Sequence, residues 1–345
     1  MVTIKDVAKD AGVSVGTVSN VINGGRVSKE KKNLVMRSIK KLDYQINALA
    51  KGMRTQKTDY VVVILPNLIN PYFALLLDAL EAELSEVGKR PILCLSNDEE
   101  EREVNFIEMA KCSKVDGIIG ITYSQIDKYL TDDIAFVSID RHYRSRVTCV
   151  ACDNKKGGWL AAENLHKRGA KNLLSFQTVS SMDSEVRKRK NGFEEYCMEH
   201  GIPYSCTELS ERQVYSLYSS YGSGNLIGKV LKAYVGENES EESVDGIFAS
   251  SDHLAVVIKE ELERMGKRVP EDVQIIGFDG LRFLNQGQPV VSSIAQPIRE
   301  IARQSVSCLT EILQTGKAES VTDLPVQFQE GFTTKGLPEG EVENV

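Results

Sequence analysis

The side chains with the clearest potential for chemistry are the lysines and arginines gathered at the amino-terminal end of the chain. Residues 1–57 contain 12 Lys and Arg and 4 Asp and Glu, a net charge of +8, whereas the whole chain of 345 residues carries −7. A basic end on an otherwise acidic protein can neutralise the phosphates of a nucleic acid. It indicates a local polyanion-binding surface rather than non-specific binding by the whole chain.

The segment that carries this charge has the spacing of two short helices joined by a tight turn. Thr3 can cap a first helix, and Gly12 stands where that helix must end, in a position that favours positive φ. Ser14 can cap a second helix, with Thr17 three residues later and apolar residues at helical spacing. This is the helix-turn-helix pattern, in which the second helix enters the major groove of DNA. The alternative is an ordinary small helical bundle with a solvated basic face.

A third helix is predicted after the pair. Ser28 can cap it, and it runs through about Leu42, with Leu34, Val35 and Ile39 facing inward and most of its lysines facing outward.

Residues 47–59 predict a short hinge helix. Asn47 can cap a helix from about Ala48 to Arg54, which Gly52 weakens by about 1 kcal/mol relative to alanine. An isolated helix of this length is marginal in water. We therefore expect it to form only when it is held against a partner chain and DNA.

From Tyr60 onward, short apolar runs alternate with amphipathic helices. The predicted strands are residues 60–65, 91–96, 117–121, 134–139, 172–176, 246–250 and 274–278. This alternation predicts an α/β fold with parallel sheets, and its length fits two doubly wound subdomains better than one.

The sequence resembles the lactose-repressor (LacI/GalR) family of bacterial transcriptional regulators over nearly its whole length. The segments that carry the resemblance keep the family's order and spacing: residues 3–23, 47–53, 70–73, 115–119, 189–193, 245–252 and 269–279. The resemblance implies a homodimer that binds a pseudo-palindromic double-stranded DNA operator and a small effector that changes operator affinity. Release of the operator by an inducer is the commoner mode in that family.

The resemblance also implies a domain order. The helix-turn-helix head would occupy residues 1–46, the hinge and linker 47–59, a periplasmic-binding-protein-like core 60–335, and a disordered tail 336–345. One subdomain of the core would combine residues of about 60–155 and 288–316, and the other 158–284 and 319–335. The crossovers would then lie near residues 154–158, 283–288 and 315–319.

The operator contacts implied by the resemblance begin in the head and end in the hinge. They are Thr3, Ser14, Val15, Gly16, Thr17, Ser19, Asn20, Asn23, Asn47, Ala50 and Met53. Val15, Gly16 and Asn20 would face base edges, with Thr17 and Ser19 nearer the phosphates. Asn20 stands where the family usually has arginine, and asparagine suits adenine whereas arginine pairs with guanine. We therefore predict an A·T pair in each half-site. Met53 stands at the position of the family's minor-groove leucine wedge.

The effector contacts implied by the resemblance are Tyr72, Phe73, Asn154, Arg189, Ser251 and Asp279. A carboxylate, an arginine and an aromatic plate suit a polyhydroxylated ligand such as a sugar. Each of three residues has an alternative role that does not involve an effector. Asp279 could cap a loop, Phe73 could belong to the helix core, and Arg189 could form a surface ion pair.

Three departures from the family pattern bear on the effector. Ser251 replaces a common asparagine and Gly280 a common second aspartate, so the cleft can accept a bulkier or differently charged ligand. Arg141 adds cationic character, which would suit a sugar phosphate or a sugar acid. The alternative function is therefore a co-repressed or activating regulator that binds a purine or a sugar phosphate.

The remaining motifs favour neither an enzyme nor a metal or cofactor site. The seven cysteines include one lone CxxC, residues 149–152, which we interpret as strand packing, and the four histidines lack metal-ligand spacing. The glycines at 222–228 are not preceded by a strand, as a dinucleotide loop would be. No apolar run suggests a signal peptide or a membrane span, so we expect a reduced bacterial cytoplasm. A sugar-modifying enzyme and a periplasmic solute-binding protein are the more remote alternatives.

Overall fold

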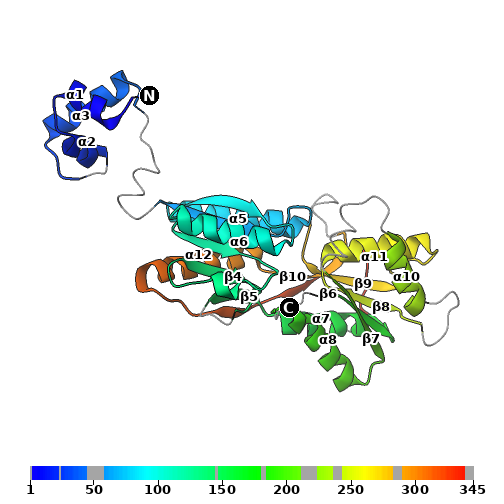
Figure 1. Cartoon of the computed structure of the whole chain (residues 1–345). Coiled ribbons are helices and arrows are strands. Elements are labelled where there is room, and N and C mark those ends of the chain that lie inside the picture. The colour runs from blue at the N-terminus through cyan, green and yellow to red at the C-terminus, as the bar shows by residue number, and fades with distance from the viewer. Residues whose placement is uncertain are drawn as a thin grey trace. The chain divides into compact units, whose positions relative to one another are not determined.

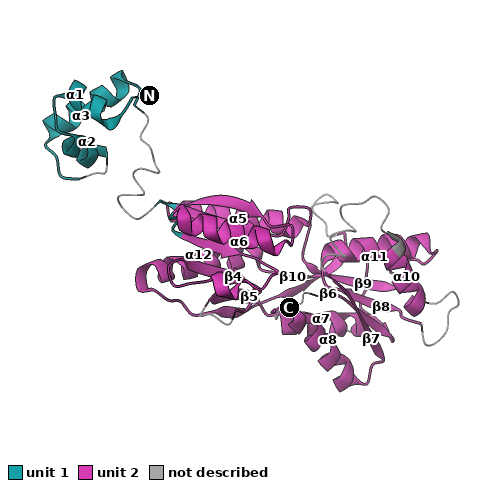
Figure 2. Ribbon diagram, in the orientation of Figure 1, with its two compact units in different colours: residues 1–59, 114–116 teal, residues 60–113, 117–345 magenta. Residues whose placement is uncertain are grey.

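The computed structural model describes residues 2–22, 25–44, 58–143, 147–179, 184–210, 224–235, 243–282 and 290–338. The chain divides into two compact units: residues 1–59 with 114–116 form one, and the remainder of the chain forms the other (Figure 2). The predicted hinge helix, with Asn47, Ala50 and Met53, lies outside the described residues, as does Asn23. Within the described ranges, no helix combines the length and apolar character that a membrane crossing requires.

The small unit contains the helices α1 (Ile4–Ala11), α2 (Val15–Ile22) and α3 (Lys29–Lys41). Gly12 ends α1 with φ 63°, and the Ser14 hydroxyl accepts the Thr17 N–H at 3.1 Å at the start of α2. The N–H and the hydroxyl of Thr3 both donate to one carboxylate, that of Asp6, at 2.8 and 2.7 Å. The predicted turn and caps are therefore confirmed.

One side of α3 differs from the prediction. Leu34 is 41% exposed, whereas Ser38 is buried beside Val35. Val35, Ser38, Ile39 and Leu42 follow the spacing of one helical face, and Leu34 lies one residue out of that register. The prediction placed Leu34 on the inward face because Leu34 is hydrophobic. The structure places Ser38 on that face instead.

The first sheet of the large unit has the order β11-β5-β4-β3-β1-β2. Its strands are β1 (Tyr60–Leu65), β2 (Arg90–Leu95), β3 (Gly117–Gly120), β4 (Ala135–Ile139), β5 (Thr148–Cys152) and β11 (Val321–Leu324), all paired in parallel. The helices α5 (Pro71–Glu86) and α12 (Ile298–Thr315) pack against each other, and α6 (Glu100–Cys112) contacts β1 and β3. A short 3-10 turn, η1 (Asp127–Tyr129), follows β3.

The second sheet has the order β12-β10-β9-β8-β6-β7. Its strands are β6 (Leu173–Val179), β7 (Tyr204–Ser210), β8 (Gly246–Ala249), β9 (Gln274–Asp279), β10 (Ser292–Ala295) and β12 (Gln327–Gln329), and β12 alone among these pairs antiparallel. The helices α7 (Asn154–Lys167) and α8 (Arg187–His200) lie on one side of the sheet (Figure 1). On the other side lie α10 (Gly224–Val235) and α11 (Asp252–Arg264). The predicted pair of doubly wound, mainly parallel sheets is confirmed.

Two of the three expected crossovers lie elsewhere. The first falls between β5 and α7, as expected near residue 154. However, β10 pairs with β9, so residues 292–295 belong to the second sheet, and the chain returns to the first sheet only at α12. Likewise β11 still belongs to the first sheet, so the last crossover lies between residues 324 and 327 rather than at 315–319.

The misplaced crossover has a physical cause in the composition of β10. Ser292 and Ser293 are fully buried, although serines gave no strand signal. The Ser292 hydroxyl lies 2.6 Å from the Thr334 hydroxyl, and the Ser293 hydroxyl accepts the Gly280 N–H at 3.0 Å. Buried hydroxyls are tolerated when they are hydrogen-bonded in this way.

The helices α7 and α8 approach closely because glycines stand where they meet. A Cβ atom on Gly158 would lie 1.7 Å from the Arg189 carbonyl oxygen, and one on Gly192 would lie 1.8 Å from the Lys155 carbonyl oxygen. The absence of both Cβ atoms lets the two backbones touch. This contact fixes the position of Arg189 relative to the start of α7.

Gly158→Ala is expected to lower the free energy of unfolding of the large unit by roughly 1–3 kcal/mol, because the α7 and α8 backbones must separate to admit the methyl group. Urea denaturation of the full chain measures this change. Gly336→Ala is the matched control, since its Cβ would meet no atom within 4 Å. Equal unfolding midpoints for the two variants would contradict the proposed close approach.

Candidate functional site

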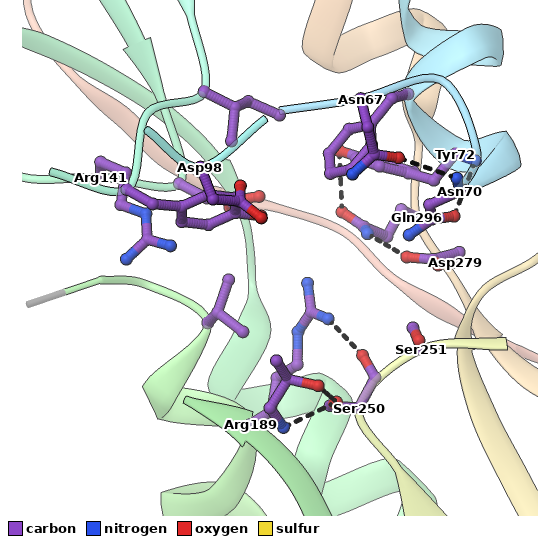
Figure 3. Close-up of a pocket in the computed structure, with 16 residues that line it drawn as sticks. Asn67, Asn70, Tyr72, Asp98, Arg141, Arg189, Ser250, Ser251, Asp279 and Gln296 are labelled. Atoms are coloured by element: carbon purple, nitrogen blue, oxygen red, sulfur yellow. Dashed lines mark hydrogen bonds between the residues drawn. The ribbon is translucent and has the colours of Figure 1, made fainter. Parts of the chain in front are cut away.

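A pocket of about 120 Å³ lies in the large unit where the carboxyl ends of the strands of both sheets meet (Figure 3). From the first sheet, Asn70, Asp98, Tyr123 and Asp140 follow β1, β2, β3 and β4. In each sheet the strand order reverses, at β1 between β2 and β3 and at β6 between β7 and β8. Open α/β sheets bind ligands at such points, outside the carboxyl ends of their strands.

The second sheet contributes its own strand ends to the same pocket. Thr178 lies in β6, Ser250 follows β8, Asp279 ends β9 and Gln296 follows β10. Because the two sheets face one cavity, a ligand there contacts both of them at once.

Arg189 is a buried side chain of the pocket with several fixed contacts. It is 5% exposed, its Nε donates to Asn154 Oδ1 at 2.7 Å, and its Nη1 donates to the Ser250 carbonyl oxygen at 2.7 Å. Its guanidinium carbon lies 3.6 Å from the centre of the Phe278 ring. Arg189 is therefore not the surface ion-pair partner that we considered as an alternative.

Asn154 lies behind the pocket rather than in its lining. Its amide nitrogen donates to the Cys152 carbonyl oxygen at 3.0 Å and contacts Asp140 Oδ1 at 3.4 Å, while its oxygen holds Arg189. The residue that we expected to contact the effector thus positions two residues that can.

The two carboxylate oxygens of Asp279 differ in their hydrogen bonding. Its Oδ1 accepts the Gln296 amide at 2.8 Å, and its Oδ2 is buried without a hydrogen-bond partner among the described residues. Burial and the nearby Asp252 raise the pKa of Asp279, whereas Arg189 lowers it. Its φ of 127° is a conformation that residues with a Cβ rarely adopt, and such strain is concentrated at functional sites. The loop-cap role that we considered does not account for the free oxygen.

The rings of Tyr72 and Phe73 pack edge to face, with their centres 5.6 Å apart. Both Tyr72 and Phe73 line the pocket, and both also belong to the buried core. The Tyr72 hydroxyl donates to Gln296 Oε1 at 3.5 Å, and burial raises the pKa of Tyr72 well above its ordinary value. Phe73 therefore fits both of the roles considered for it.

Ser251 lines the pocket, but its hydroxyl is already in use. It accepts the Leu254 N–H at 3.2 Å and caps α11. The pocket therefore brings together Tyr72, Phe73, Arg189, Ser251 and Asp279.

Sequence reasoning missed several polar residues of the lining: Asn67, Asn70, Asp98, Asp140, Ser250 and Gln296. Most of them directly follow a strand. Position after a parallel strand was the signal that could have identified them. Gln296 could not be found in this way because β10 itself was not predicted.

The two sheets also touch beside the pocket. The Asp140 carbonyl oxygen accepts the Glu185 N–H at 3.0 Å, and Arg141 forms an antiparallel bridge with Ser184. Glu185 is buried and pairs with both His142 and Lys188, the latter at 2.7 Å. This segment leads directly into α8 and Arg189. The loop after β4 is therefore in direct contact with the segment that leads to Arg189 on the opposite side of the pocket.

In the small unit, α2 presents an exposed face. Val15, Gly16 and Asn20 are exposed, with Val15 at 41%. Ser19 is buried between the helices instead, so it does not share the face on which Thr17 is partly exposed. Lysines and arginines on α1 and α3 are exposed, which agrees with a surface that binds phosphates.

Asp252→Asn is expected to change how the stability of the protein depends on pH. Burial raises the pKa of Asp252 in the folded chain from its ordinary value of 3.8 to about 6. The folded state therefore binds this proton more tightly than the unfolded state, so the free energy of unfolding falls as the pH rises between those two values. The variant should gain roughly 1–3 kcal/mol on the parent between about pH 4 and about pH 7.

Urea denaturation at several pH values measures this gain. Asp132→Asn, at an exposed position, is the control and should follow the parent. The same pH dependence in Asp252→Asn and in the parent would contradict the assignment.

Comparison with known proteins agrees with both units. Residues 3–47 match the sequence family described as bacterial regulatory proteins, lacI family, and residues 162–334 match a periplasmic binding protein-like domain. A ribose operon repressor of Halalkalibacterium halodurans is 31% identical over 97% of this chain and 98% of its own. A sucrose operon repressor of Pediococcus pentosaceus is 30% identical over 96% of this chain and 98% of its own.

A solved structure extends the likeness to three dimensions. The lac repressor dimer bound to operator and the anti-inducer ONPF matches 97% of this chain and 99% of its own, with a TM-score of 0.80 and 20% identity. At that identity the match establishes a shared fold. Taken with the two repressors, it shows that the chain belongs to the lacI family of bacterial regulatory proteins.

Proposed function

We propose that this protein is a repressor of carbohydrate-utilisation genes whose affinity for a DNA operator is set by a small sugar. The observation that carries the proposal is the presence in one chain of a basic helix-turn-helix head and a polar pocket that joins two sheets. The repressors to which it is similar are named for sucrose and ribose operons. The protein is a DNA-binding regulator and not an enzyme.

The DNA-binding part of the proposal rests on α2 and on the surrounding charge. An exposed asparagine, Asn20, can form a bidentate pair with adenine N6 and N7 in the major groove. Gly16 offers no side chain for base readout, so base discrimination by α2 falls mainly on Asn20 and Val15. The head reads one half-site, and a homodimer reads the two halves of a pseudo-palindrome.

The effector is a small neutral sugar. The described lining carries the carboxylates of Asp98, Asp140 and Asp279 and the guanidiniums of Arg141 and Arg189. A phosphate would add negative charge to a site in which the carboxylates already outnumber the arginines, whereas sugar hydroxyls can donate to carboxylates and accept from guanidiniums. A volume of about 120 Å³ is far below that of pockets for drug-sized ligands and fits a small molecule.

Coupling between the effector and the operator follows from the position of the pocket. A sugar that contacts Arg189 and Asp140 together favours one relative placement of the two sheets over others. The operator and the sugar must then change each other's affinity by the same factor. We place this activity in the bacterial cytoplasm, where the operator is, and the proposed direction is release of the operator by the sugar.

Asp279→Ala is expected to bind the effector more weakly by about 0.5–1.5 kcal/mol, because a sugar hydroxyl loses its hydrogen-bond partner. Isothermal titration with D-ribose, D-fructose and sucrose measures this loss. The same variant should bind operator DNA as the parent does while no longer responding to sugar. Unchanged sugar affinity would show that the effector does not bind at Asp279.

Asn20→Ala is expected to show the opposite pattern: normal sugar binding and weak operator binding. In the parent, exchanging the contacted A·T pair for G·C in each half-site should cost about 1–3 kcal/mol. Fluorescence anisotropy with an operator selected from a random duplex pool measures both effects. Equal affinity of the parent for the A·T and G·C duplexes would rule out the assigned base contact.

A further inference from the structure

The end of the pocket that belongs to the first sheet contains a carboxylate for which the function proposed above has no specific use. We propose that Asp98 determines the specificity of the effector site, by accepting a hydroxyl of the bound sugar at the opposite end of the pocket from Asp279. This inference rests on the proposed sugar-binding function of the same pocket. It adds that the end of the ligand nearest the first sheet is recognised by Asp98.

The position of Asp98 is the first argument. It follows β2, it lines the pocket, and it lies beside Arg141 on one side of the cavity, whereas Asp279 and Gln296 lie on the other (Figure 3). A ligand that fills the cavity therefore has two polar ends to satisfy.

The second argument is an unused acceptor. The Oδ1 atom of Asp98 is buried without a hydrogen-bond partner among the described residues, as is the Oδ2 atom of Asp279. Leaving a buried polar atom unpaired costs free energy, so proteins rarely keep one without a reason. A sugar hydroxyl that donates to each carboxylate would remove this cost at both ends of the pocket.

The backbone supplies a third argument. Asn97 has φ 51° and Asp98 φ 60°, both in the left-handed region, and the Asn97 N–H is fixed by the Pro66 carbonyl oxygen at 2.8 Å. Asp140 and Asp279 also have positive φ, at 60° and 127°. Glycine would adopt such angles without strain. Aspartate tolerates φ near 60° better than most L-residues, so Asp98 and Asp140 fit their turns and place carboxylates in the lining, whereas the φ of Asp279 is rare for any residue with a Cβ.

The charge state of Asp98 depends on the neighbouring guanidinium of Arg141, which other buried residues hold in place. Arg141 is 2% exposed, and its guanidinium lies 4.3 Å from the centre of the Tyr123 ring. The Tyr123 N–H in turn donates to the carboxylate of the buried Glu103 at 2.9 Å. Glu103 thus holds Tyr123, and Tyr123 holds Arg141 beside Asp98.

This arrangement makes Asp98 an acceptor at neutral pH. Burial raises the pKa of Asp98 to about 6, and Arg141 limits the rise. Above that pH the ionised carboxylate has no proton to donate, so it accepts hydrogen bonds only. It should therefore select a free hydroxyl at this end of the ligand and reject both a deoxy analogue and a phosphate ester.

Isothermal titration of the full chain at about pH 7.5 tests the proposal. The probes are D-ribose, D-fructose, D-xylulose and sucrose, followed by the monodeoxy analogues of whichever sugar binds. Asp98→Asn and Asp98→Ala should each bind that sugar roughly 10- to 100-fold more weakly than the parent. Asp132→Asn, the same change at an exposed position, should bind like the parent.

The analogues identify the hydroxyl that Asp98 accepts. One monodeoxy analogue should lose the same factor against the parent chain and lose nothing further against Asp98→Ala, because the two changes remove the same interaction. Analogues lacking other hydroxyls should lose affinity equally for both chains. This pattern supports the proposal.

The proposal is overturned if both Asp98 variants bind the sugar as the parent does, or if no analogue shows the non-additive loss. Should a variant fail to fold, the parent chain alone decides, because equal affinity for every monodeoxy analogue is incompatible with a carboxylate that reads one hydroxyl. If none of the sugars binds the parent, the proposed function itself fails, and with it this inference. Loss of binding in Asp279→Ala together with unchanged binding in both Asp98 variants refutes the inference alone.

Discussion

The buried guanidinium of Arg189 is the interaction on which the core of this protein depends. A charge removed from water is tolerated only when its donors are paired. Here the partners come from distant parts of the chain: Asn154 at the first crossover, the Ser250 carbonyl oxygen after β8, and the ring of Phe278 in β9. The glycines at the α7–α8 contact let Arg189 reach all of them. The first crossover, the helix pair and the second sheet are therefore held together at one cation.

The same cation also contributes to the switch that we propose for the pocket. Burial raises the pKa of both Asp140 and Asp279, and Arg189 opposes that rise in each, although the two carboxyl groups come from different sheets. Buried acceptor atoms remain without partners on Asp98 and Asp279 among the described residues. A ligand that supplies their hydrogen bonds stabilises one arrangement of the sheets, and the contact between Asp140 and Glu185 links that arrangement to α8. Part of the free energy of ligand binding would then shift the equilibrium between conformations of the two sheets.

Much of this could be predicted from the sequence, and the failures have identifiable causes. The helix-turn-helix caps and seven of the strands were found because they depend on local spacing and apolar runs, whereas β5, β7, β11 and β12 were not among the predicted strands. The strand β10 was missed because Ser292 and Ser293 are polar residues whose hydroxyls find partners only in the folded protein. The same error moved one crossover and hid Gln296. Asp98 was overlooked because it lines a cavity formed by segments that are far apart in the chain. The periodicity of the sequence does not reveal such a cavity.

The claim at the centre of this account is that the pocket and the operator-binding head are energetically linked. The most direct test is to measure the affinity of the full chain for its sugar with and without a saturating operator duplex, and its affinity for the operator with and without saturating sugar. Linkage predicts the same factor in both comparisons, typically between about 5- and 150-fold. Sugar affinity that does not change when the operator is bound would contradict the account.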